Sequence, residues 1–270
     1  PKLLHRGRAV VVHEAVPVAA QAQPGTVLSA DATGLVVATA DGGLRLTRLT
    51  RLDGQPLTSA DAAELLQLAR GDTVEPAAAR TDWAACLTAA PALARVEPAL
   101  LKHLADRRVP QLPVDLRGRG PAHHVTVPLP AAFVARHGTQ LPQATLAAFT
   151  GLLSALLRDD VFDLNWVGPQ DDAPHGAAAA LINRSRPWRV DVPATARFDD
   201  WVRTVDAQCR TLDSQPGFLK DLVARHAVLR DQADLRDAAW SSVAVLREGQ
   251  ALPAGASLAL VLRADGAALH

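Results

Sequence analysis

The feature that most constrains the fold of this chain is a series of short β-like segments near its start, separated by glycine turns. Residues 35–40 and 44–49 are two such segments, and Asp41-Gly42 lies between them. An Asp-Gly pair between apolar runs is a strong hairpin signal, because both central positions of the tight turn favour a positive φ. Short strands joined by such turns predict a small β-barrel. Further turns are expected at Pro24-Gly25 and Asp53-Gly54.

One helix is expected to follow these strands. Thr58 or Ser59 can cap its start, because a hydroxyl oxygen accepts a backbone N–H group there. Asp61 favours the positive end of the helix dipole, and Gly71 is the predicted stop. The barrel region is therefore expected to span residues 1–72.

Residues 73–121 are rich in Ala, Pro and Arg and are predicted to form a linker. Two short helices are expected in it, around residues 83–87 and 98–105. The domain boundary is expected in this stretch, because boundaries favour exposed, proline-rich segments that few contacts cross.

Residues 122–270 show a mixed pattern, in which strands alternate with amphipathic helices. Such alternation predicts a mixed α/β layer. Apolar residues recur at helical spacing over residues 146–157, 198–212 and 218–229. Strands are expected over residues 124–129, 161–167, 188–192, 242–246 and 257–263.

Two stretches near the start carry a family resemblance: Pro-Gly-Thr-Val-Leu at residues 24–28 and GLVVATADGGLRL at residues 34–46. Together they resemble the C-terminal domain of methionyl-tRNA formyltransferases over about residues 8–70, although Ala40 replaces that family's usual Gly. The resemblance implies an open barrel of the oligonucleotide-binding (OB) type. That family's catalytic Asn, His and Asp belong to a separate N-terminal domain, which this segment does not resemble. We therefore expect no formyl transfer by this chain alone.

Three matches in the later sequence resemble, in order, the second half of a nonribosomal peptide synthetase condensation domain over about residues 123–270. Residues 146–168 are similar to the helix and strand before that family's VG.P segment. Residues 177–192 are similar to its GxFVNTxPLRV strand, with Asn183 in place but Arg184 for the usual Thr. Residues 198–223 are similar to the helix pair that follows. The resemblance implies a truncated, chloramphenicol-acetyltransferase-like α/β sandwich half.

Condensation by that family needs an HHxxxDG motif in the other half of the domain. The single His pair here is His123-His124, and Pro128 stands where an acidic residue would help to orient the site. Adjacent residues on a strand point to opposite faces, so the pair is not expected to share a metal ion either. We expect neither condensation catalysis nor a metal site.

No other motif predicts a catalytic site. A helix start explains the carboxylate pair Asp199-Asp200, which favours the positive end of the helix dipole. The remaining candidates lack partners at a catalytic or metal-ligand spacing: His137, His175, His226, Asp171, Asp172, Ser214, Ser241, Ser242, Cys86 and Cys209.

Charge and composition narrow the choice of partners. Lys+Arg and Asp+Glu are both 28, so nucleic-acid binding is not favoured. The best basic cluster is Arg45, Arg48, Arg51, Arg186 and Arg189. It is interpreted as a solvated strand face, as a docking surface for a neighbouring domain or carrier-protein phosphate, or as an RNA contact. No apolar run reaches the ~20 residues of a membrane span, and the start shows no signal peptide, so a bacterial cytoplasmic protein is expected.

These features predict an α+β chain of two degenerate domains without catalytic activity. We expect a piece of a longer nonribosomal peptide synthetase of secondary metabolism, acting as a structural and docking region. Adenylation and carrier-protein domains are the expected partners, and ATP and phosphopantetheine are expected on those neighbours. Two alternatives remain open: part of a formylating starter module whose catalytic domain lies upstream, and a binding module for a carrier protein or tRNA.

Overall fold

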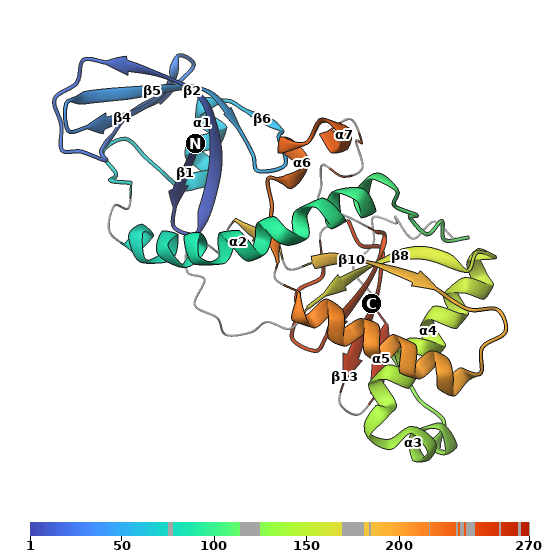
Figure 1. Ribbon diagram of the computed structural model, residues 1–270. Helices are drawn as coiled ribbons and strands as arrows, with labels where there is room; N and C mark the ends of the chain where they lie inside the picture. Colours follow the sequence, from blue (N-terminus) through green and yellow to red (C-terminus); the bar gives the residue numbers. More distant parts are fainter. Residues whose placement is uncertain are drawn as a thin grey trace. The chain divides into compact units, whose positions relative to one another are not determined.

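The computed structural model describes residues 1–74, 78–113, 125–168, 181–183, 185–215, 217–230, 232, 235, 241–253, 255–263 and 266–269 (Figure 1). The chain forms two compact units. Unit 1 contains Pro1–Arg95, Asp172–Asn183 and Phe218–Arg236, and unit 2 contains Val96–Asp171, Arg184–Gly217 and Asp237–His270. Each unit therefore combines stretches that lie far apart in the sequence.

Unit 1 is built on a curled antiparallel sheet with the order β1-β2-β5-β4-β3, and β6 pairs with β5 (Figure 1). Helix α1 (Ser59–Leu66) packs against five of these strands, and its Ala62 and Leu66 join the apolar core of the sheet. The strands are β1 (Lys2–His5), β2 (Arg8–Val18), β3 (Val27–Asp31), β4 (Gly34–Thr39), β5 (Gly42–Thr50) and β6 (Pro56–Leu57).

The predicted hairpin between β4 and β5 is present, but its turn lies one residue earlier than expected. Thr39 pairs with Gly42, so the two turn residues are Ala40 and Asp41, and neither has a positive φ. Gly42 instead begins β5 with a φ of 146°. The turn with two positive φ values joins β1 to β2 at Arg6-Gly7, where the sequence pattern predicted no hairpin.

Helix α1 begins where the sequence predicted and ends earlier. Thr58 accepts the Asp61 N–H group and donates its own N–H group to the Asp61 carboxylate, which forms a capping box. The predicted stop at Gly71 was wrong, because Gln67 already adopts the left-handed conformation and ends the helix. Gly71 instead lies in a segment beside β3, where its N–H group donates to the Val27 carbonyl at 2.8 Å.

Unit 1 is completed by two segments from the far end of the chain. Strands β9 (Ile182–Asn183) and β11 (Phe218–Leu219) form a two-stranded antiparallel sheet. Their neighbours Leu181 and Leu219 belong to an apolar cluster that also contains Leu4, Ala9 and Leu52. The formyltransferase-like stretch and the distal segments therefore share buried apolar surface.

An ion pair ties the same parts of unit 1 together. The Lys2 ammonium lies 2.8 Å from a carboxylate oxygen of Asp221, and the side chain of Asp221 is almost fully buried. The turn at Gly54 lies against Ala224, because a Cβ atom added to Gly54 would stand 3.2 Å from the Ala224 Cβ atom. Its φ of 89° also favours glycine.

The predicted third helix, over residues 218–229, was wrong. Its first residues form β11, and two one-turn helices follow, α6 (Leu222–Arg225) and α7 (Ala227–Arg230). His226 between them has an extended backbone, with φ −113° and ψ 116°. The strand pairing of Phe218 and Leu219 with β9 prevents a single helix, although the apolar residues recur at helical spacing.

The two short helices expected in the linker are replaced by one helix of 28 residues, α2 (Ala78–Ala105). It contains Pro91 and Pro98, each of which removes one backbone hydrogen bond. The alanine-rich sequence favours a continuous helix, and burial of Leu93 and Leu104 anchors it. Proline therefore misled the prediction of the helix boundaries.

Unit 2 contains a six-stranded mixed sheet with the order β10-β8-β12-β13-β14-β7. β12 pairs in parallel with both β8 and β13, and the outer pairs are antiparallel. The elements match the predicted alternation of strands and helices. They are β7 (Val125–Val127), α3 (Ala131–His137), a short 3-10 helix η1 (Gly138–Gln140), α4 (Leu141–Leu157), β8 (Val161–Val167), β10 (Ser185–Asp191), α5 (Phe198–Ser214), β12 (Val243–Arg247), β13 (Leu258–Arg263) and β14 (Gly266–Leu269).

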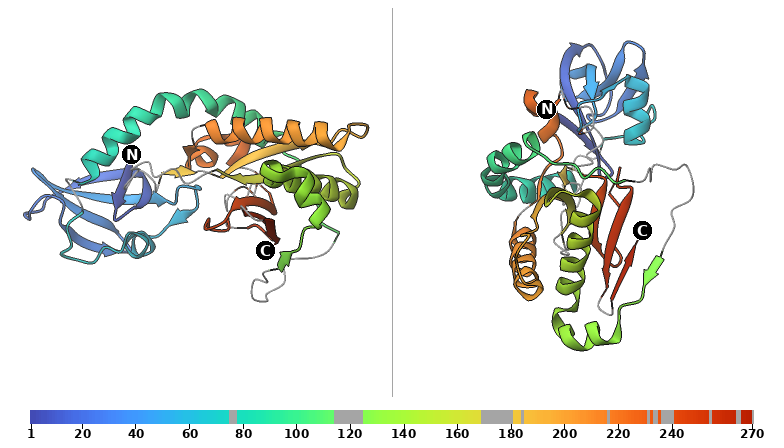
Figure 2. Two further views of the ribbon diagram at one scale, coloured as in Figure 1. Left: turned by 90° about the horizontal axis from the view of Figure 1, so that it is seen from below. Right: turned by 90° about the vertical axis from the view of Figure 1, so that its right-hand side faces the viewer.

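Helices α4 and α5 lie side by side in unit 2 (Figure 2). They share one apolar core with alternate residues of β8, namely Phe162, Leu164 and Trp166. Asp163 and Asn165 between them point to the opposite face, because strand residues alternate, and both are fully buried. Strand β8 therefore carries apolar side chains on one face and buried polar side chains on the other.

The helical stretch Ala131–Leu157 is long and apolar enough to cross a membrane by length and composition. Half of its most apolar window is buried in the protein, where Leu146, Phe149 and Leu153 enter the core of unit 2. The η1 turn at Gly138–Gln140 also interrupts it. Packing within unit 2 therefore accounts for the buried half of this stretch.

Candidate functional site

The five arginines of the predicted docking cluster do not form one group. Arg45 and Arg48 lie on β5 of unit 1, and Arg51 follows that strand. Arg186 and Arg189 lie on β10 of unit 2. Their contacts separate them into side chains that hold the fold together and side chains that face solvent.

Arg186 is a buried structural arginine. Its guanidinium donates to the Leu212 carbonyl at 2.6 Å and to the Gln215 carbonyl, at the carboxyl end of α5. Carbonyls at a helix end lack partners within the helix, and a cation there also complements the helix dipole. Arg186 therefore joins β10 to the end of α5 and is not available as a docking residue.

We expect the variant Arg186→Ala to lower the free energy of unfolding by about 2–3 kcal/mol, because charged hydrogen bonds are lost and the buried Leu212 carbonyl loses its partner from Arg186. Urea unfolding followed by circular dichroism measures this change. The matched variant Arg48→Ala removes an exposed arginine and should change the same quantity by less than about 0.5 kcal/mol. Equal losses of unfolding free energy in the two variants would contradict the assignment of Arg186 as a structural residue and Arg48 as a solvent-facing one.

Arg189 is part of a polar cluster around the buried carboxylate of Asp163. Its guanidinium donates to both carboxylate oxygens, at 2.9 and 2.8 Å. The His103 ring contacts the same carboxylate at 2.8 Å, and the Arg108 N–H group donates to it at 2.6 Å. Arg189 also pairs with the exposed Asp106 at 2.9 Å. The charge of Arg189 is therefore largely neutralised within unit 2.

Electrostatics in this cluster favour the charged forms of both partners. Burial alone would raise the pKa of Asp163, but the hydrogen bonds from His103, Arg189 and Arg108 outweigh burial and lower its pKa to about 2. The hydrogen bonds that Arg189 donates to Asp163, despite desolvation, raise the pKa of Arg189. Asp163 is thus an ionised structural carboxylate at neutral pH, with no free oxygen to act as a base.

The three arginines of unit 1 differ in their surroundings. The Arg45 side chain lies over Gly34, because a Cβ atom added there would meet its Cγ atom at 2.6 Å. Arg48 and Arg51 are exposed. Arg48 is the one that also lines a pocket of about 350 Å³ on unit 1, together with residues of α6 and α7.

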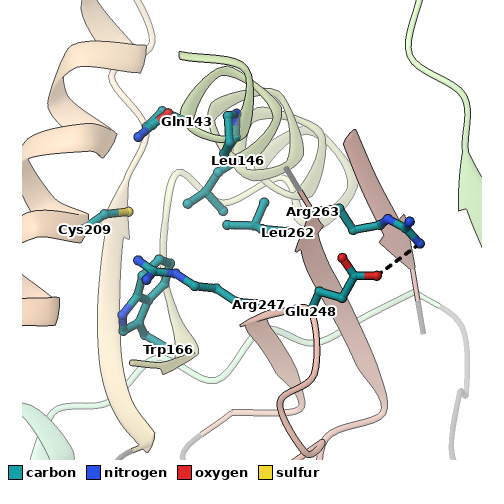
Figure 3. A pocket seen from close by; sticks show the side chains of 9 residues that line it. Gln143, Leu146, Trp166, Cys209, Arg247, Glu248, Leu262 and Arg263 are labelled. Carbon is teal, nitrogen blue, oxygen red and sulfur yellow. Dashed lines mark ion pairs between the residues drawn. The ribbon is translucent and has the colours of Figure 1, made fainter. Parts of the chain in front are cut away.

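A second pocket, of about 440 Å³, lies in unit 2 between α4, α5 and the ends of β8, β12 and β13 (Figure 3). Leu146 and Leu262 point into it, and Arg247 extends towards Trp166. Asp213 accepts from the indole N–H of Trp166 at 3.0 Å and from Arg247 at 2.6 Å, so it positions both side chains. Arg263 at the rim pairs with Glu248 at 3.5 Å.

Cys209 lines this second pocket but is not a nucleophile. Burial, and next the charges of Asp213 and Asp206, raise the pKa of its thiol to about 12. A thiolate is the reactive form of cysteine. The thiol therefore stays protonated at neutral pH and contributes an apolar wall.

The remaining sequence candidates have local structural contacts where the structure describes them. Asp199 and Asp200 lie in the first turn of α5, as predicted, and Asp199 pairs with Arg136 at 2.8 Å. Ser214 donates to the Thr211 carbonyl at 2.8 Å, and Ser241 accepts the Val243 N–H group at 3.1 Å. In the described parts of the chain, no three His, Cys, Asp or Glu side chains converge as metal ligands. His123, His124, Asp171, Asp172, His175 and the side chain of Cys86 lie outside the described residues.

Sequence comparison finds a known family at the start of the chain. Residues 3–67 match the model of the formyl transferase C-terminal domain. A methionyl-tRNA formyltransferase of Ectopseudomonas mendocina (strain ymp) is 47% identical over 55 residues, which are 20% of this chain and 18% of that protein. The chain thus spans less than a fifth of the length of this curated relative.

The structural neighbours of the chain include an X-domain and a starter condensation domain. The X-domain from teicoplanin biosynthesis is 17% identical, with a TM-score of 0.49, over 87% of this chain and 64% of that chain. The starter condensation domain of rhizomide synthetase, in complex with C8-CoA and Leu-SNAC, is 14% identical, with a TM-score of 0.42, over 66% of this chain and 45% of that chain. This chain therefore carries a formyl transferase C-terminal-like segment at residues 3–67, and its structural neighbours are condensation and X-domains.

Proposed function

We propose that this chain is a non-catalytic structural and docking region of a nonribosomal peptide synthetase or a related adenylating assembly-line enzyme. The observation that carries the proposal is that unit 1 combines the first part of the chain with two segments that lie far away in the sequence. Its curled sheet, which we propose to be an OB-like barrel, shares an apolar cluster with Leu181 and Leu219 from the condensation-like stretch. Because this cluster joins the first strands to the distal segments, unit 1 is suited to act as a structural scaffold.

The sequence resemblance of residues 123–270 supports the synthetase context, with a truncated chloramphenicol-acetyltransferase-like half as the proposed fold. The titratable groups of the described site also support a structural role, because Asp163 and Cys209 are held in unreactive forms. In this proposal adenylation and carrier-protein domains are the partners, and ATP and phosphopantetheine belong to them. Exposed Arg48 and Arg51 are the proposed docking residues, and Arg45 lies on the same strand as Arg48.

Separate expression of this chain and the adenylation domain of the parent enzyme tests the docking role. We expect the two polypeptides to co-elute at micromolar concentration. Replacement of Arg48 and Arg51 by Gln should weaken the complex by about tenfold, because rim charges contribute to protein association. The control Arg70→Gln removes another exposed arginine of unit 1 and should leave the complex unchanged. No association between two folded polypeptides would overturn the docking role.

The match of residues 3–67 favours one second candidate, a part of a formylating module. In that case a formyltransferase catalytic domain with its Asn, His and Asp residues precedes this chain in the parent protein. The parent protein would then transfer a formyl group to an aminoacyl substrate, and mass spectrometry of the product would show the added formyl group. The scaffold proposal expects an unmodified product. Salt-dependent binding of tRNA would support the third alternative, a nucleic-acid binding module.

A further inference from the structure

The pocket on unit 1 has walls from two distant parts of the sequence. One wall comes from β2, β5 and the turn after β5, and the other from α6, α7 and the residue before α6. The pocket has a volume of about 350 Å³, which suits a small ligand or the end of a longer one. Its lining residues are Val11, His13, Arg48, Thr50, Gly54, Asp221, Ala224, Arg225 and Arg230.

The lining of this pocket is strongly basic. Among the lining residues that the structure describes, Asp221 is the one acidic residue, and its carboxylate already lies 2.8 Å from the Lys2 ammonium and 3.1 Å from the Arg225 guanidinium. Arg48 and Arg230 are exposed, and neither guanidinium makes an ion pair or a hydrogen bond with any residue that the structure describes. Two guanidinium groups therefore line the pocket without forming an ion pair to any carboxylate in the described part of the chain.

Neutral donors stand beside these two charges. The His13 ring and the Thr50 hydroxyl are hydrogen bonded at 2.9 Å. Desolvation, and next the positive charge of Arg48, lower the pKa of His13. This shift favours the neutral imidazole, which offers a hydrogen bond to a ligand rather than a third charge.

We propose that this pocket binds a phosphate group, held by Arg48 and Arg230. A guanidinium presents paired N–H donors that match two phosphate oxygens, and these two guanidinium groups, which have no ion-pair partner among the described residues, retain that capacity. The inference rests on the proposed function in one respect, since the source of the phosphate is then the phosphopantetheine arm of a carrier-protein domain. All the lining residues of the pocket belong to unit 1.

Calorimetric titration of this chain with phosphopantetheine and with pantetheine tests the proposal, because the two ligands differ only in the phosphate. We expect phosphopantetheine to bind at least tenfold more tightly than pantetheine, with an affinity that falls as salt rises. The double variant Arg48→Gln, Arg230→Gln should lose at least tenfold in affinity for phosphopantetheine, and the control Arg70→Gln should lose none. Thermal unfolding confirms that each variant is folded.

The outcomes separate this site from the docking role, because the titration contains no partner domain. Inorganic phosphate that binds as tightly as phosphopantetheine supports the phosphate site and assigns it to free phosphate. Equal binding of phosphopantetheine and pantetheine, or no binding of either, overturns the proposal. Unchanged affinity of the folded double variant also overturns it.

Discussion

The variant Asp163→Ala is expected to lower the free energy of unfolding by about 3–5 kcal/mol. Its carboxylate is fully buried and accepts hydrogen bonds from Arg189, His103 and the Arg108 N–H group. Alanine at this position leaves the partly buried Arg189 guanidinium and the Arg108 N–H group without their acceptor. Equilibrium unfolding in urea at pH 7 measures the loss.

The control for this prediction is Asp106→Asn, which removes the other carboxylate that pairs with Arg189. The Asp106 side chain is 73% exposed, against 0% for Asp163. An exposed ion pair contributes little, so the control should lose less than about 1 kcal/mol. Similar losses for the two variants would show that the cluster around Asp163 does not stabilise unit 2.

The same carboxylate predicts a dependence of stability on pH. Its pKa is about 2 in the folded protein and about 4 in an unfolded chain. A lowered folded-state pKa stabilises the protein above the unfolded pKa, and this contribution is lost as the pH falls from about 4 towards 2. Its size is roughly 2.5 kcal/mol. Between pH 6 and pH 3 the wild type should therefore lose more stability than Asp163→Asn, and parallel curves would contradict this assignment.

The variant Leu181→Ala is expected to lower the free energy of unfolding of unit 1 by about 2–4 kcal/mol, because it opens a cavity in a buried cluster. Leu181 is 3% exposed and packs with Leu4 and Ala9 of the first two strands. Limited proteolysis should show faster cleavage within both the distal segments and β1. Hydrogen exchange of the β1 amides gives the same information residue by residue.

Val228→Ala is the matched control for Leu181→Ala, because Val228 belongs to the same distal part of unit 1 and is 58% exposed. It should change stability by less than about 0.5 kcal/mol. Faster cleavage of the distal segments with unchanged protection of β1 would show that the two parts of unit 1 unfold independently. That result would remove the physical basis for a shared scaffold.

Local sequence patterns correctly predicted the strands and the helix cap that depend mainly on neighbouring residues. The runs around Leu35, Leu46 and Leu164 became strands, and Thr58 became the helix cap with Asp61 as its partner. The pattern failed where tertiary contacts decide. Phe218 has the spacing of a helix but pairs with β9, and Pro91 lies inside a continuous helix that other residues stabilise.

The site was less predictable than the fold, because residue type alone does not reveal burial or partners. Arg48 and Arg186 entered the same predicted cluster, yet one is exposed and the other is buried against the end of α5. Asp163 was missed as a key residue. Its position within the apolar run Val161–Val167 was the available signal, because a lone carboxylate in a buried strand needs partners. Distal residues such as Arg230 reach the unit 1 pocket through tertiary structure that no local pattern encodes.

The proposed scaffold consists of the curled sheet and the distal segments of unit 1. The most direct test of it is to cut the chain between the curled sheet and α2. A protease recognition sequence inserted at residues 75–77 allows cleavage after folding, and size-exclusion chromatography in native buffer follows the fragment of residues 1–74. The account predicts that this fragment stays with the rest of the chain, held by the cluster around Leu181 and by the Lys2–Asp221 ion pair, and that Leu181→Ala weakens the association. Elution of residues 1–74 as a separate folded fragment would contradict the account.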